Sequence, residues 1–266
     1  QGARHRISFL KNKLITPSAA TKKASLVIDK TYASIYKTYQ LELAKNNSVD
    51  FDDLLLLPLK IFEENQEILS KYQNLWKYIL VDEYQDTNMP QFKLVKYLSG
   101  DHQQVCVVGD DDQSIYGWRG AEVRNILDFK KLFDNCEVFK LEKNYRSTGH
   151  ILDAAISVVK NNENRASKKL SSNSGAGNKL GLIETNDELE EADAVINALE
   201  KEIKLDKRNF SDFAILYRTN AQSRALEDAF RRSGIPYNIV GGVRFYDRKE
   251  IKDLIGYLSL IINPKD

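Results

Sequence analysis

The chain has 266 residues and a formal net charge of +1, with 42% hydrophobic and 29% charged residues. This length allows one or two domains, and the composition is that of a soluble globular protein. No apolar run approaches the roughly 18 residues of a membrane span, and the basic N-terminus lacks the apolar stretch of a signal peptide. Two cysteines, Cys106 and Cys136, do not make a disulfide framework, so we expect a cytoplasmic protein.

The first 40 residues are basic. They contain eight lysines and arginines and one acidic residue, Asp29. Such a segment could follow a phosphate backbone or form a solvated helical face, and charge alone does not decide between the two. Tyr32, Ile35, Tyr36 and Tyr39 recur at helical spacing, so we expect a helix with these side chains facing a core.

A helix is predicted over residues 54–62, directly after the string Val49-Asp-Phe-Asp-Asp53. Acidic side chains at this place favour the N-terminal end of a helix, where the helix dipole is positive. Pro58 lies inside the helical pattern, and because proline has no backbone N–H it predicts a kink or a boundary there.

Two short apolar runs follow, at 77–81 and 105–108, with a helix predicted between them over residues 90–98. Short apolar runs bounded by turn signals are typical of parallel strands that are covered on both faces. In that arrangement Cys106 would be a core residue. Strands that alternate with helices predict a parallel sheet.

Acidic and polar side chains follow each of these runs. Asp82 and Glu83 come after the first run, and residues 110–113, including Gln113, come after the second. Because ligands of open α/β sheets bind beyond the carboxyl ends of the strands, these groups are placed to grip a phosphate and its metal. One carboxylate can hold Mg²⁺ while its neighbour orients or deprotonates an attacking water. The alternative for this pair alone is a solvated acidic turn.

Aromatic rings alternate with a cation just after Gln113, in Tyr116, Trp118 and Arg119. Such residues are most often core, but Gly117 and Gly120 permit an exposed backbone here. Stacking of a base on an aromatic ring contributes about 1–3 kcal/mol and tolerates any base. The segment is therefore a candidate platform for single-stranded nucleic acid.

The second half of the chain repeats the alternation of apolar runs and helical patterns. Strands are predicted at 138–141, 180–184, 213–217 and from 235 into the glycine turn at 241–242, and helices at 149–160, 187–204, from 218 onward, and at 249–262. The expected fold class is therefore α/β with parallel sheets flanked by helices.

Three strings in this order resemble the superfamily 1 DNA helicases, with the closest likeness to the UvrD/Rep/PcrA group. They read Asp82-Glu-Tyr-Gln-Asp86, Gly109-Asp-Asp-Asp-Gln-Ser-Ile-Tyr-Gly-Trp-Arg-Gly-Ala121 and Asn144-Tyr-Arg-Ser147. The resemblance covers essentially the whole chain and implies parts of two RecA-like domains with part of a helical insertion domain. It implies the following segments: 1–48, the C-terminal part of the helical 1B insertion; 49–135, the C-terminal part of RecA-like domain 1A; 136–244, the N-terminal part of RecA-like domain 2A; and 245–266, the start of the helical 2B insertion.

The resemblance also implies ATP and Mg²⁺ as cofactors and gives roles to particular residues. Asp82 would hold Mg²⁺, Glu83 would activate water, and Gln113 would contact the γ-phosphate. Tyr145 would stack on the adenine, and Arg146 would act as an arginine finger, a device that contributes about 10³ to 10⁵ in rate. The alternative for Arg146 is a salt bridge at the start of the following helix.

Contacts to single-stranded DNA are implied for Tyr116, Trp118 and Arg119, and further along the chain for Arg218, Asn220 and Arg244. Helix capping is a competing role for Asn220, because asparagine is a preferred N-cap residue.

The phosphate-binding P-loop, Gly-x-x-x-x-Gly-Lys-Ser/Thr, does not occur, since the sequence contains no Gly-Lys dipeptide. The late motifs of the family are also absent. We therefore expect a central fragment, inactive alone, of an ATP-dependent helicase that moves 3′ to 5′ on single-stranded DNA and acts at single/double-strand junctions. Open alternatives are a non-catalytic DNA-binding scaffold and a helicase–nuclease subunit, and the sequence does not distinguish repair from replication.

Overall fold

The computed structural model describes residues 2–100, 102–133, 135–163, 165–241 and 249–262. The chain divides into two compact units, Gln1–Lys179 and Leu180–Asp266, which are described separately. Among the described residues, no helix is long and apolar enough to cross a membrane.

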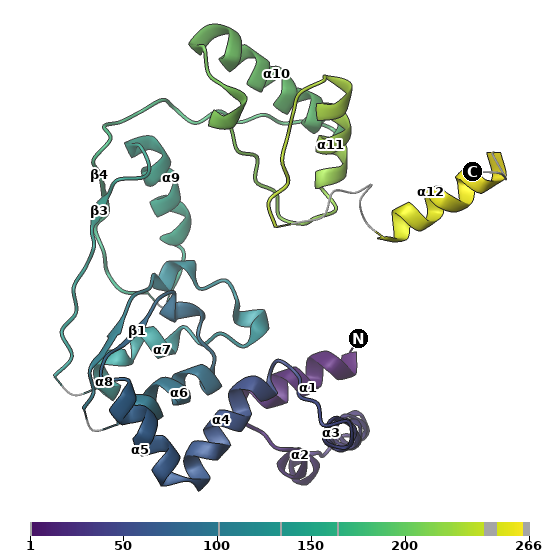
Figure 1. Cartoon of the computed structure of the whole chain (residues 1–266). Coiled ribbons are helices and arrows are strands. Elements are labelled where there is room, and N and C mark those ends of the chain that lie inside the picture. Colours follow the sequence, from purple (N-terminus) through teal and green to yellow (C-terminus); the bar gives the residue numbers. More distant parts are fainter. Residues whose placement is uncertain (1, 101, 134, 164, 242–248, 263–266) are drawn as a thin grey trace. The chain divides into compact units, whose positions relative to one another are not determined.

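The first unit begins with three packed helices, α1 (Gly2–Asn12), α2 (Pro17–Lys23) and α3 (Val27–Lys45) (Figure 1). Their shared core consists of Ile7, Leu10, Ala20, Ala33 and Tyr36. The predicted helix is confirmed, but its buried face is narrower than expected. Ala33 and Tyr36 lie in the core, whereas Ile35 and Tyr39 are exposed, because three small helices bury only the stripe where they touch.

A buried ion pair joins α1 to α4 (Asp53–Glu64). The Lys11 ammonium lies 2.8 Å from a carboxylate oxygen of Asp50 and 2.8 Å from one of Asp53. Lys11 is fully buried, so this member of the basic N-terminal segment has a structural partner.

Helix α4 continues through Pro58, and the predicted boundary there is wrong. Proline removes one helical hydrogen bond, and the helix continues beyond it. Helix α5 (Gln66–Leu75) follows.

A parallel pair of strands forms the centre of the first unit. Strands β1 (Ile79–Val81) and β2 (Val105–Val107) pair in register and are connected through α6 (Met89–Ser99) (Figure 1). Helix α6 starts with a capping box between Asn88 and Gln91, which satisfies backbone donors at its N-terminus. Helices α7 (Arg124–Leu127) and α8 (Phe129–Leu132) complete this region.

One face of this strand pair is covered and the other is open. Phe92, Val95, Ile126 and Phe129 pack with the half-buried side chains of Ile79, Val81, Val105 and Val107. The alternating residues point the other way, and Leu80 is 78% exposed. Cys106 is exposed as well. The prediction of strands covered on both faces, with a core Cys106, is therefore wrong, because helices pack on one side only.

The rest of the first unit contains a second parallel pair, β3 (Lys143–Asn144) with β4 (Ser171–Ser172), and helix α9 (Gly149–Val159) between them. The strand predicted at 138–141 does not form, and Phe139 and Leu141 are exposed. This run has strand-like residues but no neighbouring strand to complete its hydrogen bonds.

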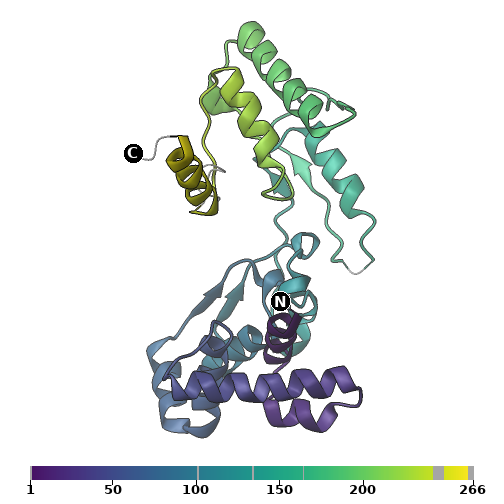
Figure 2. The same cartoon turned by 90° about the vertical axis from the view of Figure 1, so that its right-hand side faces the viewer.

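The second unit is helical in its described part. Helices α10 (Glu188–Asp206) and α11 (Ser223–Arg232) lie side by side (Figure 2), and α12 (Lys249–Ile262) follows. The core between α10 and α11 consists of Ala192, Ile196, Leu199, Ala229, Phe230 and Ile235. The strands predicted at 180–184, 213–217 and from 235 are absent there, and Leu182 and Leu216 are exposed. The chain as a whole is a helix-rich α/β protein with short parallel strand pairs, so the predicted α/β class with parallel strands is confirmed.

Candidate functional site

The carboxylates of Asp82 and Glu83 lie on an exposed turn at the end of β1. Glu83 adopts a left-handed backbone conformation, with φ 49° and ψ 41°. A residue with a side chain pays about 1–3 kcal/mol for such a conformation, and this kind of strain clusters at functional sites. The Oδ1 atom of Asp82 accepts a hydrogen bond from the backbone N–H of Glu83 at 2.9 Å, which orients the Asp82 carboxylate.

A buried glutamine, Gln85, joins this turn to the loop after β2. Its amide nitrogen donates to Oε2 of Glu83 at 2.8 Å, and its amide oxygen accepts from the backbone N–H of Asp110 at 3.0 Å. Its backbone carbonyl accepts from the Ser114 hydroxyl at 3.0 Å. Gln85 belongs to a string that carries the family resemblance, but no local signal in the sequence indicates that its side chain bridges two strand ends.

Gln113 closes the short helix η2 (Asp111–Gln113), which follows β2. Its side chain is exposed, and its amide nitrogen donates to Oδ2 of Asp110 at 2.8 Å. The sequence therefore placed Gln113 and the Asp82–Glu83 pair correctly at the ends of two neighbouring parallel strands, and the structure links these ends through Gln85.

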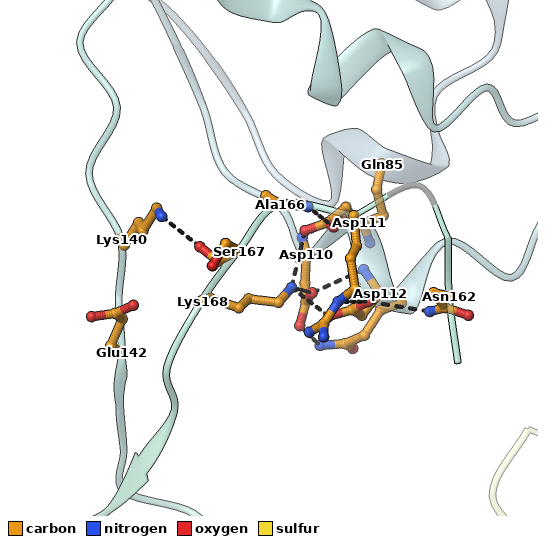
Figure 3. Close-up of polar contacts among 12 residues, drawn as sticks. Gln85, Asp110, Asp111, Asp112, Lys140, Glu142, Asn162, Ala166, Ser167 and Lys168 are labelled. Atoms are coloured by element: carbon orange, nitrogen blue, oxygen red, sulfur yellow. Dashed lines mark hydrogen bonds and ion pairs between the residues drawn. The ribbon is translucent and has the colours of Figure 1, made fainter. Parts of the chain in front are cut away.

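The three aspartates before Gln113 form an ion cluster with a segment that lies far away in the sequence (Figure 3). Lys168 extends toward this triplet and pairs with Asp110, and it lies 3.0 Å from carboxylate oxygens of Asp111 and Asp112. Arg165 donates two hydrogen bonds to Asp112, at 3.1 and 2.7 Å. Neither cation was singled out from the sequence, because only the tertiary fold brings them to the triplet.

The cations of this cluster lower the pKa values of two of its carboxyl groups, those of Asp110 and Asp112. Burial raises the pKa of Asp112, but hydrogen bonds from Arg165 and Lys168 outweigh burial, so its pKa lies below the ordinary value. Burial and hydrogen bonds from Lys168 and Gln113 act on Asp110 in the same way, and its pKa is also lowered. Although the three carboxylates have oxygens within 4.8 Å of one another, their charge is already paired with two cations, and we assign no metal to them.

An exposed aromatic cluster follows, built around the short helix η3 (Gly117–Arg119). The rings of Tyr116 and Trp118 have centroids 6.2 Å apart, and Trp118 is 68% exposed. The Arg119 guanidinium lies over both rings, at 5.3 Å from the first and 4.6 Å from the second. Gly120 has φ +87°, which closes the turn in a conformation that suits glycine. These side chains are not core residues, and they form an exposed cluster of two rings and a cation.

Tyr145 and Arg146 come directly after β3, in a turn held by Asn144. The Asn144 Oδ1 atom accepts hydrogen bonds from the backbone N–H groups of Arg146 and Ser147, at 3.0 and 2.8 Å. Tyr145 is exposed, with Lys143 over its ring at 5.4 Å. Within the described residues, the Arg146 guanidinium forms no ion pair, so the salt bridge considered for it at the start of α9 does not occur there.

The remaining sequence-predicted residues belong to the second unit. Arg218 and Asn220 are exposed in the loop before α11. The Gln222 side chain, through Oε1, accepts from the backbone N–H groups of Arg218 and Thr219 at 3.0 and 2.9 Å. Gln222 is also the N-cap residue of α11, so Asn220 does not cap this helix. Arg244 lies outside the described residues.

Comparison with known proteins matches both parts of the chain. Residues 1–134 match the family described as the UvrD/REP helicase N-terminal domain, and residues 139–266 match the UvrD-like helicase C-terminal domain. Proteins named "ATP-dependent DNA helicase PcrA" from Staphylococcus epidermidis (strain RP62A) and Staphylococcus aureus (strains Mu50 and COL) are 49% identical over 260 residues. The match covers 98% of this chain and 36% of each relative. The chain belongs to the UvrD/Rep/PcrA family of superfamily 1 DNA helicases.

Proposed function

We propose that this chain forms the central part of an ATP-dependent helicase that moves along single-stranded DNA. The observation that carries this proposal is the shared edge of β1 and β2. Asp82 and Glu83 follow one strand, and Gln113 with the exposed rings of Tyr116 and Trp118 follows its parallel neighbour. Groups suited to a phosphate and groups suited to DNA bases thus follow the same two neighbouring strands of one unit.

We further propose the segment boundaries that the family likeness implies, with 1–48 in insertion 1B, 49–135 in domain 1A, 136–244 in domain 2A and 245–266 in insertion 2B. In support, one family match ends at residue 134 and the next begins at 139. The compact first unit nevertheless extends to Lys179. The ion pairs of Lys168 and Arg165 with the aspartate triplet give a physical reason for that extension.

At the nucleotide, Glu83 takes the proton of the attacking water, and Gln113 and Arg146 contact the γ-phosphate. Arg146 is suited to this because its guanidinium has no ion-pair partner among the described residues. A free arginine can stabilise the charge that develops on a transferred phosphoryl group. The exposed ring of Tyr145 stacks on the adenine.

Asp82 is the candidate ligand for Mg²⁺. Its side chain is exposed, and within the described residues its Oδ1 accepts one hydrogen bond, from Glu83 at 2.9 Å, which leaves Oδ2 available. A single carboxylate with waters and phosphate oxygens is a common magnesium environment. When bound, the ion would neutralise phosphate charge.

The DNA contacts of the proposal are Tyr116, Trp118 and Arg119 in the first unit and Arg218, Asn220 and Arg244 further along the chain. Exposed rings beside a cation are typical of sites that bind single strands without sequence preference. Movement from 3′ to 5′ and action at single/double-strand junctions are proposed on the family likeness.

Phosphate release from ATP, measured with and without single-stranded DNA, tests the proposal. The complete gene product should hydrolyse ATP in response to DNA, and Glu83→Gln should reduce that response to a small residual rate. The 266-residue chain alone should release no phosphate above its own Glu83→Gln control, because the sequence has no Gly-Lys dipeptide and hence no P-loop. A complete product that binds DNA without hydrolysing ATP would refute the helicase and favour a DNA-binding scaffold.

A further inference from the structure

The side chain of Gln85 is 1% exposed and is satisfied at both ends. It donates to the Glu83 carboxylate at 2.8 Å and accepts from the Asp110 backbone at 3.0 Å. Asp110 begins the loop that carries Gln113 and leads to Tyr116. A single buried amide therefore connects the proposed catalytic base to the proposed phosphate and DNA contacts.

The packing around Gln85 is tight on the side of Gly109. A Cβ added at Gly109 would lie 2.4 Å from Oε1 of Gln85 and 2.8 Å from Cδ1 of Ile126. Gly109 does not have a positive φ, so its backbone conformation does not require glycine. The absent side chain instead makes room for the Gln85 amide against the loop.

The two hydrogen bonds of the amide have different consequences. The bond to Asp110 N–H satisfies a backbone donor, and any side chain of the same length that carries an acceptor could make this bond. The bond to Glu83 orients an exposed carboxylate that would otherwise rotate freely, and a bond from an amide to a charged oxygen is among the stronger hydrogen bonds. Only a donor at this position holds Glu83 in one orientation.

We propose that Gln85 is a positioning residue for ATP hydrolysis, which holds the Glu83 carboxylate in a fixed relation to the Gln113 loop. This inference rests on the proposed function, in which Glu83 activates the attacking water. Gln85 acts through Glu83 and does not itself touch the nucleotide. Its removal should therefore slow the chemical step more than it weakens the binding of ATP or DNA.

The Gln85→Glu variant keeps an acceptor for Asp110 N–H and replaces the neutral donor to Glu83 by a second carboxyl group, which repels the Glu83 carboxylate or shares a proton with it. In the complete gene product we expect the DNA-stimulated kcat to fall about 10- to 100-fold, the size expected when a reacting group is misplaced. KM for ATP and the affinity for a labelled oligo-dT strand should stay within about threefold. Gln104→Glu is the matched control, since Gln104 is exposed in the same unit, and it should leave all three quantities unchanged.

A double-mutant cycle distinguishes positioning from general structural support. If Gln85 acts through Glu83, adding Gln85→Glu to Glu83→Gln should cause no further loss of turnover. Losses that multiply, or a wild-type kcat in Gln85→Glu, would overturn the proposal. If Glu83→Gln itself retained full turnover, the proposed function would fail, whatever Gln85 does.

Gly109→Ala provides a second variant that leaves both Glu83 and Gln85 in place. Its methyl group would displace the Gln85 amide, so the same loss of kcat at similar KM is expected. Thermal unfolding monitors folding in each case. A folded Gly109→Ala variant with normal kcat would contradict the proposal, and failure of both variants to fold would assign Gln85 a structural role instead.

Discussion

The two parallel strand pairs of the first unit end in different ways. At the end of β1 and β2, Glu83 and the Asp110 backbone are joined by the buried amide of Gln85. At the end of β3, the backbone turn is held by Asn144, but the side chains of Tyr145 and Arg146 extend without hydrogen bonds or ion pairs among the described residues. A group that aligns a water must be held still, whereas a group that reaches a phosphate supplied by a ligand must stay unpaired until the ligand binds.

Lys168 and Arg165 connect the end of β2 to the start of the second strand pair. Both lie just before β4 in the sequence and pair with the aspartate triplet that follows β2. Figure 3 shows Lys168 extending toward that triplet. The loop after β2 is therefore anchored to the segment that leads into β4, and we call these ion pairs the bridge. Substitutions can test the difference between the two strand ends and the bridge between the two strand pairs.

The largest effect is expected at the end of β3. Arg146→Ala in the complete gene product should lower DNA-stimulated ATP turnover by about 10³-fold or more, the range of an arginine finger. Its thermal unfolding should match wild type, because the guanidinium has no partner in the described structure. Lys160→Ala, an exposed cation in the same unit, serves as the control. A loss of stability together with activity would show that Arg146 supports the fold.

A smaller effect is expected at the bridge. Lys168→Met leaves the carboxylates of Asp111 and Asp112, which are 8% and 4% exposed, without their shared cation. We expect destabilisation by about 2 kcal/mol, below the range for a fully buried pair because the cluster is partly exposed. Urea unfolding followed by fluorescence reports on this unit, since Trp76 and Trp118 both lie in it. Lys169→Met is the neighbouring exposed control. Equal urea midpoints for the two variants would show that the bridge does not contribute to stability.

At the aromatic cluster, Trp118→Ala should weaken binding of a labelled oligo-dT strand by about 1–3 kcal/mol, the contribution of one stacked base. Stability should change little, because the ring is exposed. Tyr78→Ala removes another exposed ring from the same unit and should leave binding intact. Anisotropy at two salt concentrations measures both variants, and unchanged affinity in Trp118→Ala would exclude this ring from the DNA site.

The smallest effect is a pH dependence of the bridge. The pKa values of Asp110 and Asp112 are lowered from 3.8 in the folded protein. Carboxyls of this kind contribute stability that is fully present above pH 3.8 and is lost as the pH falls through the lower folded-state pKa. Urea midpoints measured between pH 7 and pH 3 should therefore fall less steeply for Lys168→Met than for wild type. Parallel curves would mean that the cluster does not contribute to acid unfolding.

The strings of polar residues and the strongly periodic helices could be recognised from the sequence. Helices α6, α9, α10 and α12 lie close to their predicted ranges, because their local patterns are sufficient to specify them, and α6 and α10 also have side-chain caps. The strings around Asp82, Gln113 and Asn144 indicate the family by their residues and order alone. The positions of Asp82 and Gln113 at neighbouring strand ends follow from the order of apolar runs and turns.

Only the tertiary structure decided which apolar runs become strands and which side chains meet. The runs at 138–141, 180–184 and 213–217 have strand-like composition, but they form no strand among the described residues, because a strand needs hydrogen bonds from a partner elsewhere in the chain. Cys106 is exposed for a related reason, since helices pack on one face of its strand. Gln85 contacts Asp110, and Lys168 contacts the same residue across 58 positions of sequence. No local pattern specifies such contacts between distant residues.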